Sequence, residues 1–271
     1  MDSPSSSLRG LQKRVVDLSD APQDARRATA ERTYPLFSTW WPELTFEQYA
    51  RGYFSPQHRL IRVYTWEDAR GELAGLLIGG AVDLDVDADR LTVIRGATCK
   101  RAGVRSVAGD VVGGLMRGLA EAALHAHRRG RIPVALAVLS SPRGFELFHN
   151  SAPRCYPSHR RSADDPRLRR WYEALRSDAG PRAQGKSPFV TEGVAFDVPD
   201  AVRARWEHSR DPAVRFYLEH CPDYGRGQEL VAVLPLEISD LLRFPYCLAR
   251  VTGGRAVRRA QRLLRPHAAS V

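Results

Sequence analysis

The chain has 271 residues, of which 43% are hydrophobic and 27% are charged, and these proportions are those of a globular protein rather than a disordered or fibrous one. Its longest apolar runs, Leu73 to Val82 and Ile132 to Leu139, are too short to cross a bilayer. The Ser-rich start, Met1 to Gly10, lacks the apolar stretch of a secretory signal. We therefore expect a soluble, cytoplasmic protein with a buried core and no membrane partner.

The charge is strongly basic, because 41 Lys and Arg residues face 31 Asp and Glu residues and give a formal net charge of +10. Such a surface attracts phosphates and acidic partners. An Arg-rich composition also follows from the codon bias of a GC-rich genome, so the charge by itself assigns no partner.

The cysteines are widely spaced and form no CxxC pair, which argues against a zinc ribbon and a dense disulfide framework. We expect free thiols at Cys99, Cys155, Cys221 and Cys247. The spacing of His149, Cys155 and His159 fits no common zinc template, so we expect no metal site.

The first expected elements are a strand over Gln12 to Leu18 and a helix over Gln23 to Phe37, which begins after Ser19 or Asp20 and tolerates Pro22 in its first turn. A second helix is expected over Phe46 to Phe54, with Thr45 as its cap. Several aromatic side chains lie around it and are expected to form core rather than a ligand wall: Trp40, Trp41, Phe46, Tyr49, Tyr53 and Phe54.

Three strands joined by short polar turns follow, at Leu60 to Trp66, Leu73 to Val82 and Arg90 to Thr98, which predicts an antiparallel meander. The segment Val107 to His127 keeps one apolar face and predicts a long helix. Ile132 to Leu139 is a continuous apolar run typical of a buried strand. Strand, helix and strand in this order predict a parallel crossover.

The rest of the chain is expected to be a C-terminal α/β extension, beginning after the loop Ser177 to Pro188. Before this loop we expect two short helices, at Arg143 to Asn150 and Arg167 to Arg176. After it we expect helices at Ala201 to Glu207 and Pro212 to about Cys221, strands at Gly193 to Val198 and Leu230 to Leu236, and a basic helix at Gly253 to Arg265. We expect a disordered lead-in over residues 1–11, a core over residues 12–176, and an extension over residues 189–271 that completes the sheet or the acceptor site.

The element order from Gln12 to Pro157 resembles that of the GNAT superfamily of acyl-CoA N-acyltransferases. The resemblance covers a little over half of the chain and implies an α/β (α+β) fold with a mixed, mostly antiparallel central sheet. It also implies that the amides at the start of the long helix cradle the pyrophosphate of coenzyme A, as helix N-termini do for anions.

The resemblance places the donor site at the turn between the fourth strand and the long helix. The implied binding residues are Lys100, Arg101, Arg105, Ser106, Val107, Ala108 and Gly109, together with Ser140 after the fifth strand. The family's glycine signature is not supplied, because counting from Arg105 puts Ala108 and the acidic Asp110 at its positions. A basic loop that only caps a helix is the alternative.

The family places a Tyr after the fifth strand that protonates the leaving thiolate, and the local match is Tyr156. A phenol with a pKa of about 10 can donate to a thiolate whose acid has a pKa of about 8.5. A packing role is the alternative. The ammonium proton of the amine needs an acceptor, for which Glu43, Glu47 and Asp83 are candidates through water, unless these acids only solvate turns.

The sequence thus favours an N-acyltransferase that moves an acyl group from acyl-CoA, or from the phosphopantetheine of an acidic acyl carrier protein, to an amine of a small molecule or peptide. One alternative is a covalent enzyme with Cys155 as nucleophile and His149 or His159 as base. The other is a basic nucleic-acid-binding protein, which no recognised binding motif supports.

Overall fold

The structure is a computed structural model and describes residues 11–104, 108–160, 165–176, 187–195 and 198–243. It divides into two compact units: the first is Met1–Ala137 with Gly193–Phe196, and the second is Val138–Glu192 with Asp197–Val271. The boundary between Ala137 and Val138 falls inside a strand. The predicted core over residues 12–176 and extension over residues 189–271 stay predictions.

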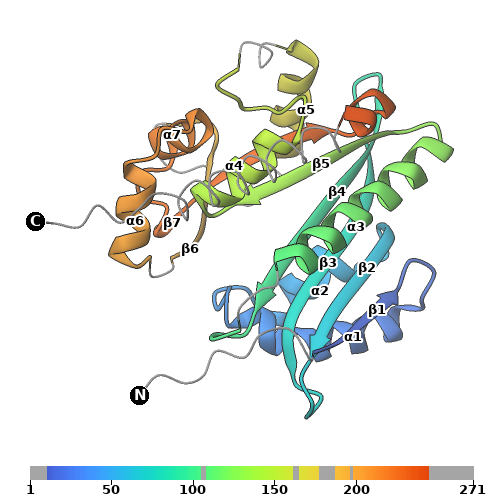
Figure 1. Ribbon diagram of the computed structural model, residues 1–271. Coiled ribbons are helices and arrows are strands. Elements are labelled where there is room, and N and C mark those ends of the chain that lie inside the picture. The colour runs from blue at the N-terminus through green and yellow to red at the C-terminus, as the bar shows by residue number, and fades with distance from the viewer. Residues whose placement is uncertain (1–10, 105–107, 161–164, 177–186, 196–197, 244–271) are drawn as a thin grey trace, which may run out of the picture. The chain divides into compact units, whose positions relative to one another are not determined.

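The first unit is built on a sheet with the strand order β1-β2-β3-β4-β5 (Figure 1). The strands are β1 (Gln12–Asp17), β2 (His58–Glu67), β3 (Leu73–Val86), β4 (Asp89–Lys100) and β5 (Ile132–Leu139). The first four pair antiparallel, and β5 pairs parallel to β4 after a crossover through α3 (Ala108–Arg128). The predicted mixed, mostly antiparallel sheet with one strand-helix-strand crossover is confirmed.

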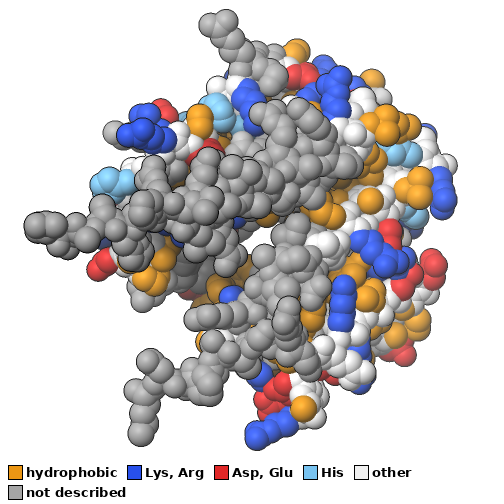
Figure 2. Space-filling view, viewed as in Figure 1, with side chains coloured by type: hydrophobic (Ala, Val, Ile, Leu, Met, Phe, Trp, Pro, Cys, Tyr) orange, Lys and Arg blue, Asp and Glu red, His pale blue; other side chains and the backbone are white. Residues whose placement is uncertain are grey.

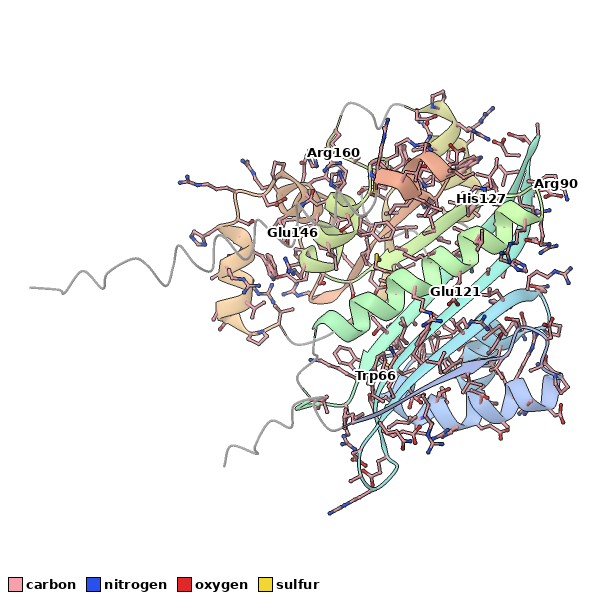
Figure 3. All side chains as sticks on the ribbon, turned by 45° about the vertical axis from the view of Figure 1, so that its right-hand side comes forward. Trp66, Arg90, Glu121, His127, Glu146 and Arg160 are labelled. Atoms are coloured by element: carbon pink, nitrogen blue, oxygen red, sulfur yellow. The ribbon has the colours of Figure 1, made fainter. Side chains whose placement is uncertain are left out.

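Helices cover both faces of this sheet. On one face, α1 (Gln23–Ser38) and α2 (Phe46–Phe54) pack their aromatic rings against Ile61 and Ile78, so the expected core role is confirmed for Tyr49 and Phe54. On the other face, α3 covers a smaller cluster of Tyr64, Trp66 and Leu77 (Figure 3). A Cβ at Gly114 of α3 would lie 3.1 Å from Leu77 Cδ2, so the glycine allows helix and sheet to approach closely.

Local signals explain where these elements begin and end. Thr45 and Gln48 form a reciprocal capping box that starts α2, as the sequence predicted for Thr45. Gly130 follows α3 with a φ of 65°, and the amide of the next residue, Arg131, donates back to the carbonyl of Ala126. This turn ends the helix and starts β5 two residues later.

The second unit contains α4 (Pro142–Ser151), α5 (Pro166–Arg176), α6 (Asp200–Glu207), α7 (Pro212–His220) and β7 (Arg226–Pro235), as well as the first part of β6 (Val190–Ala195). Ser141 caps α4 and Asp211 caps α7, and the two helices pack together. The predicted strand Gly193 to Val198 begins too late. The Val231 amide of β7 donates to the carbonyl of Phe189 at 2.9 Å, so strand pairing starts before Gly193.

Several expectations fall outside the described residues: most of the lead-in, most of the loop Ser177 to Pro188, Cys247 and the basic helix Gly253 to Arg265. Within the described residues, no helix is long and apolar enough to span a membrane. The cysteines that are described, Cys99, Cys155 and Cys221, are buried free thiols.

Candidate active site

The C-terminal half of β4 has one edge without a strand partner. The parallel ladder between β4 and β5 runs from Leu91 opposite Ile132 to Ile94 opposite Ala135 and then stops, although both strands continue. On its other side, β4 stays paired with β3 as far as Lys100. Among the described strands, none therefore pairs with Gly96 to Lys100 on the side that faces β5.

The direction of the backbone groups on this edge follows from the register. The Arg101 amide donates to the Ala74 carbonyl of β3, and hydrogen-bonding residues alternate along an antiparallel strand. The N–H and C=O groups of Gly96, Thr98 and Lys100 consequently face away from β3. The Lys100 carbonyl accepts a 2.6 Å hydrogen bond from the Trp40 indole, while Gly96 and Thr98 are exposed. The edge therefore offers amides that can bind an extended ligand or a carbonyl oxygen.

The loop after β4 is the site that the sequence assigned to the donor. Lys100 is exposed, whereas the Arg101 guanidinium pairs with Asp68 at 2.8 Å and Glu72 at 3.0 Å on the turn between β2 and β3. This contact holds the pKa of Asp68 below its usual value. Val104 is buried under α3. The loop is thus tied to the sheet by Arg101 and Val104.

The remaining donor residues are only partly described. Arg105, Ser106 and Val107 lie outside the described residues, whereas Ala108 and Gly109 form the first turn of α3. The helix α3 therefore begins eight residues after the end of β4, close to the start at Val107 that the sequence predicted. Ser140 lies in the second unit directly after β5, next to the cap of α4.

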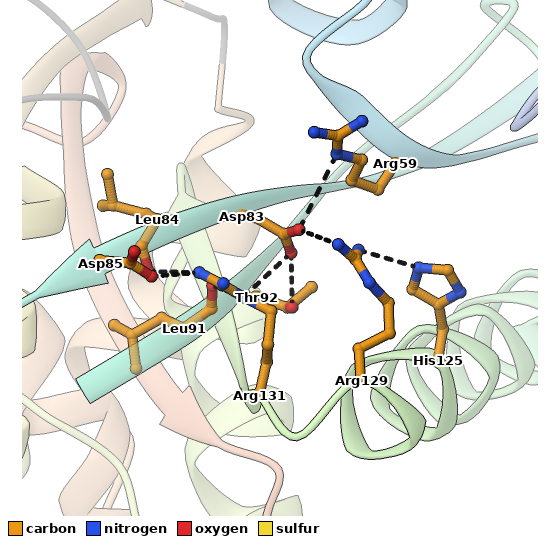
Figure 4. Close-up of polar contacts among 9 residues, drawn as sticks. All are labelled: Arg59, Asp83, Leu84, Asp85, Leu91, Thr92, His125, Arg129 and Arg131. Atoms are coloured by element: carbon orange, nitrogen blue, oxygen red, sulfur yellow. Dashed lines mark hydrogen bonds and ion pairs between the residues drawn. The ribbon is translucent and has the colours of Figure 1, made fainter.

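Asp83 lies at the opposite end of the β3-β4 ladder from this loop. It pairs with Thr92, which is eight residues before Lys100 on β4, or about 27 Å at about 3.4 Å per residue. Its carboxylate accepts from Thr92 at 2.8 Å and pairs with Arg129 at 2.8 Å and Arg131 at 3.3 Å (Figure 4). The structure therefore separates Asp83 from the donor loop and places it in an arginine cluster.

Glu43 and Glu47 belong to the segment that carries Trp40. Glu43 is exposed in the turn between α1 and α2, three residues after Trp40, whose indole reaches the end of β4. Glu47 pairs with Arg27 at 3.1 Å on the surface of the two helices. Glu43, and not Glu47, therefore lies in the turn whose Trp40 contacts the end of β4.

Tyr156 lies in the second unit and exchanges both backbone hydrogen bonds with Val233 of β7. Its ring packs edge-on against Tyr172 and Phe189, with centroid separations of 5.2 and 5.8 Å. The side chain is half-buried, so the ring is held by packing while part of it is accessible.

Cys155, the nucleophile of the alternative covalent enzyme, lies in surroundings that disfavour a thiolate. The thiol is buried and donates to the Pro157 carbonyl at 3.6 Å, and burial raises the pKa of Cys155 to about 12. It is therefore a protonated thiol at neutral pH rather than a thiolate nucleophile. The imidazole of His149 contacts Ser158 instead. In the described part of the chain, no group of three or more His, Cys, Asp or Glu side chains is arranged to hold a metal ion.

Two features of the site were not identified from the sequence: the unpaired edge at Gly96 and Thr98, and the anchoring of that edge by Trp40. The only available signal was Gly96 itself, a glycine inside a strand, which often marks a close approach of backbone or ligand. The aromatic cluster around α2 suggested core for Trp40, yet 40% of this residue is exposed.

No protein-family model matches the chain, and no curated protein matches it either. Among solved structures, the chain is similar to a GCN5-related N-acetyltransferase from Kribbella flavida, with 17% identity, a TM-score of 0.32, and coverage of 84% of this chain and 99% of that one. It is also similar to a protein proposed to be a phosphinothricin N-acetyltransferase, with 13% identity, a TM-score of 0.29 and coverage of 84% and 99%.

A third similar structure is a GCN5-related glucosamine N-acetyltransferase region of a fungal multi-domain GH3 β-N-acetylglucosaminidase, with 16% identity and a TM-score of 0.29. It covers 77% of this chain and 22% of that one. The names of the first and third of these structures contain the term GCN5-related. The fold is established by the strand order and strand registers of this chain and not by these similarities.

Proposed function

We propose that the chain is a GNAT-type N-acyltransferase, which moves an acyl group from a thioester donor to an amine. The observation that carries this proposal is the unpaired edge of β4 from Gly96 to Lys100, which leads directly into the turn before α3. An extended thioester donor can add to such an edge as a further strand would, because backbone amides there lack a ladder partner.

In the proposed reaction the amine attacks the thioester carbonyl directly. The developing oxyanion accepts hydrogen bonds from β4 amides, for which Gly96 and Thr98 are the candidates. The nitrogen–carbon bond forms, the carbon–sulfur bond breaks, and the thiolate departs with the electron pair. Tyr156 is the proposed donor of the proton that neutralises this thiolate.

The proton lost by the amine needs an acceptor, and we propose Glu43 acting through water. One contact supports this choice, because the turn of Glu43 reaches the end of β4 through Trp40. Asp83, which pairs with Thr92, lies about 14 Å from Gly96 and about 20 Å from Thr98 along the strand. Asp83 is also already engaged by Arg129 and Arg131.

We propose acyl-CoA as the donor, bound with its phosphates near Lys100 and the first turn of α3. An acyl carrier protein is the alternative donor, because it ends in the same phosphopantetheine thioester. In the part of the surface that Figure 2 colours, several basic side chains lie beside acidic ones, which favours the first choice. Among the described ion pairs, Arg62 contacts Glu121 at 3.1 Å. Such pairing weakens long-range attraction of an acidic protein.

The decisive experiment supplies the purified chain with acetyl-CoA and longer acyl-CoA thioesters together with a panel of small amines and peptides. Release of free thiol and formation of an amide are followed in parallel, the second by mass spectrometry. We expect thiol release that depends on the amine and matches the amide formed. Thiol release that is the same without any amine, or no amide with any donor, would contradict the proposal.

The same assay separates the two donors by their salt dependence. Raising the ionic strength from 0.1 to 1 M shortens the screening length from about 10 to about 3 Å and weakens contacts between protein surfaces. We expect turnover with acyl-CoA to persist and any turnover with the carrier-bound acyl group to fall more steeply. Equal slopes for the two donors would remove a role for the basic surface in donor recruitment.

A further inference from the structure

The second unit contains a chain of polar contacts that the proposed transfer does not use. His149, near the end of α4, is fully buried, and its Nε2 lies 2.7 Å from Ser158 Oγ. Its other ring nitrogen, Nδ1, lies 3.2 Å from Asn150 Oδ1. A serine hydroxyl, an imidazole and an amide oxygen are therefore connected in series.

The partners of Asn150 fix the proton positions in this series. Its Oδ1 accepts from Arg160 Nη2 at 3.2 Å, and its Nδ2 faces Asp211 Oδ2 at 3.5 Å, so the amide oxygen points to His149 (Arg160 is labelled in Figure 3). An amide oxygen only accepts hydrogen bonds, so Nδ1 of His149 carries the proton. Nε2 then presents its lone pair to Ser158 Oγ–H, which is the arrangement a general base needs.

The surroundings keep this imidazole in its neutral form. Burial, reinforced by the charge of Arg160 and by the neighbouring His159 ring, lowers the pKa of His149 to about 4, against smaller opposing effects of Asn150 and Asp211. Phe145 packs on the imidazole with a centroid separation of 5.2 Å. At neutral pH the base is thus free to accept a proton.

Ser158 is more accessible than the base. Its side chain is half-buried, and its Oγ also accepts from the Arg160 amide at 3.1 Å, which holds the oxygen next to His149. The exposed His159 ring stacks on His149 at 4.6 Å and is followed by Phe216 at 6.4 Å and His220 beyond it. These rings form a partly exposed aromatic surface beside the hydroxyl, which suits an apolar acyl or aryl group.

We propose that Ser158 is a nucleophile, with His149 as its general base and Asn150 as the residue that orients the base, and that it accepts acyl groups from activated esters or thioesters. Ser158 Oγ bonds to the acyl carbon while its proton moves to His149 Nε2. The bond to the leaving oxygen or sulfur breaks, and that atom takes the proton from His149. Water then attacks the acyl-serine, releases the carboxylic acid and returns the proton to Ser158.

This covalent route is separate from the direct transfer proposed above, which forms no acyl-enzyme and uses neither Ser158 nor His149. Either activity can therefore fail without the other. The same unit also supplies a matched control, because Ser187 Oγ lies 3.0 Å from Nδ1 of His220. Among the contacts described for His220, no amide or carboxylate oxygen orients its second ring nitrogen.

A fluorophosphonate probe tests the nucleophile directly, since serine attack on phosphorus displaces fluoride and leaves a stable adduct. We expect the intact mass of the full chain to increase by one adduct, mapped to Ser158 by peptide mass spectrometry. Ser158→Ala should abolish the adduct, whereas Ser187→Ala should leave its rate unchanged. No adduct at Ser158, or an adduct that survives Ser158→Ala, would overturn the proposal.

The pH dependence of labelling tests the base in the unaltered chain, where refolding of a variant is not a concern. With the lowered pKa of His149, labelling at pH 5.5 should stay within about twofold of that at pH 7.5. A solvent-exposed histidine with a pKa of about 6.5 would give about a tenfold fall over the same range. Labelling that a folded His149→Gln variant retains would exclude His149 as the base. A tenfold fall would contradict a base that burial keeps neutral down to pH 5.5.

Discussion

Gly96 offers a sharp test of the site, because it lies on the unpaired edge of β4 and directly opposite Gly79 of β3. A Cβ added at Gly96 would lie 3.0 Å from the backbone oxygen of Ile78, and that oxygen cannot move without disturbing β3. A Cβ at Gly79 would meet nothing within 4 Å. Neither glycine has a positive φ, so alanine can adopt both backbone conformations.

The pair of variants Gly96→Ala and Gly79→Ala isolates the cost of that contact. Replacing glycine by alanine stabilises a protein by about 0.4 to 1 kcal/mol through the unfolded chain, and this gain is common to both variants. Overpacking costs about 1 to 3 kcal/mol and applies only to Gly96→Ala. The two variants should therefore differ in free energy of unfolding by about 1 to 3 kcal/mol, or about 2 to 12 °C in Tm.

Thermal unfolding measures this difference, and the KM for acyl-CoA measures its effect on function. Because relief of the contact moves the edge that carries the Gly96 and Thr98 amides, the donor KM should rise in Gly96→Ala and stay near its normal value in Gly79→Ala. Equal Tm values for the two variants would refute the packing argument. An unchanged donor KM in a destabilised Gly96→Ala variant would remove the β4 edge from the donor site.

Three further predictions concern single side chains. Tyr156→Phe keeps the ring and removes the hydroxyl, so kcat for acyl transfer should fall while Tm changes little; an unchanged kcat would leave Tyr156 as a packing residue. Burial lowers the pKa of His58 to about 4, so the unfolded chain takes up the proton at a higher pH than the folded chain does. The free energy of unfolding should therefore fall by up to about 3 kcal/mol as the pH falls from about 6.5 to about 4. Denaturant unfolding should show a smaller fall in His58→Gln, and an equal fall in both proteins would contradict this. Asp83→Asn leaves the buried Arg131 with one carboxylate fewer and should cost about 1 to 3 kcal/mol in thermal unfolding, whereas an unchanged Tm would show that the cluster does not stabilise the fold.

Much of the fold follows from local sequence. The cap at Thr45, the apolar run Ile132 to Leu139 and the one-sided apolar face of the helix after Val107 each depend on residues close together in the chain. These signals predicted the sheet class and the parallel crossover correctly. The predicted start of β6 was wrong because this strand pairs with β7, about forty residues later in the chain, and no local sequence pattern indicates that pairing.

The candidate site depended on contacts that the sequence does not display. The residues change in character after Ile94, where Arg95 and Gly96 follow, but nothing in the sequence shows that the pairing of β4 with β5 stops there. Asp83 is close to the donor loop in sequence order, but the antiparallel register carries it to the far end of the ladder.

The sequence by itself determined the elements, their order, the basic charge and the position of the helix start that follows β4. Only the tertiary structure decided that one edge of β4 has no strand partner and that burial keeps the Cys155 thiol protonated. It also decided that His149 contacts Ser158 rather than a cysteine. The physical reason is that periodicity and capping act over a few residues. Strand register, burial and the meeting of side chains are set by the packing of distant segments, whose energies are summed over the whole fold.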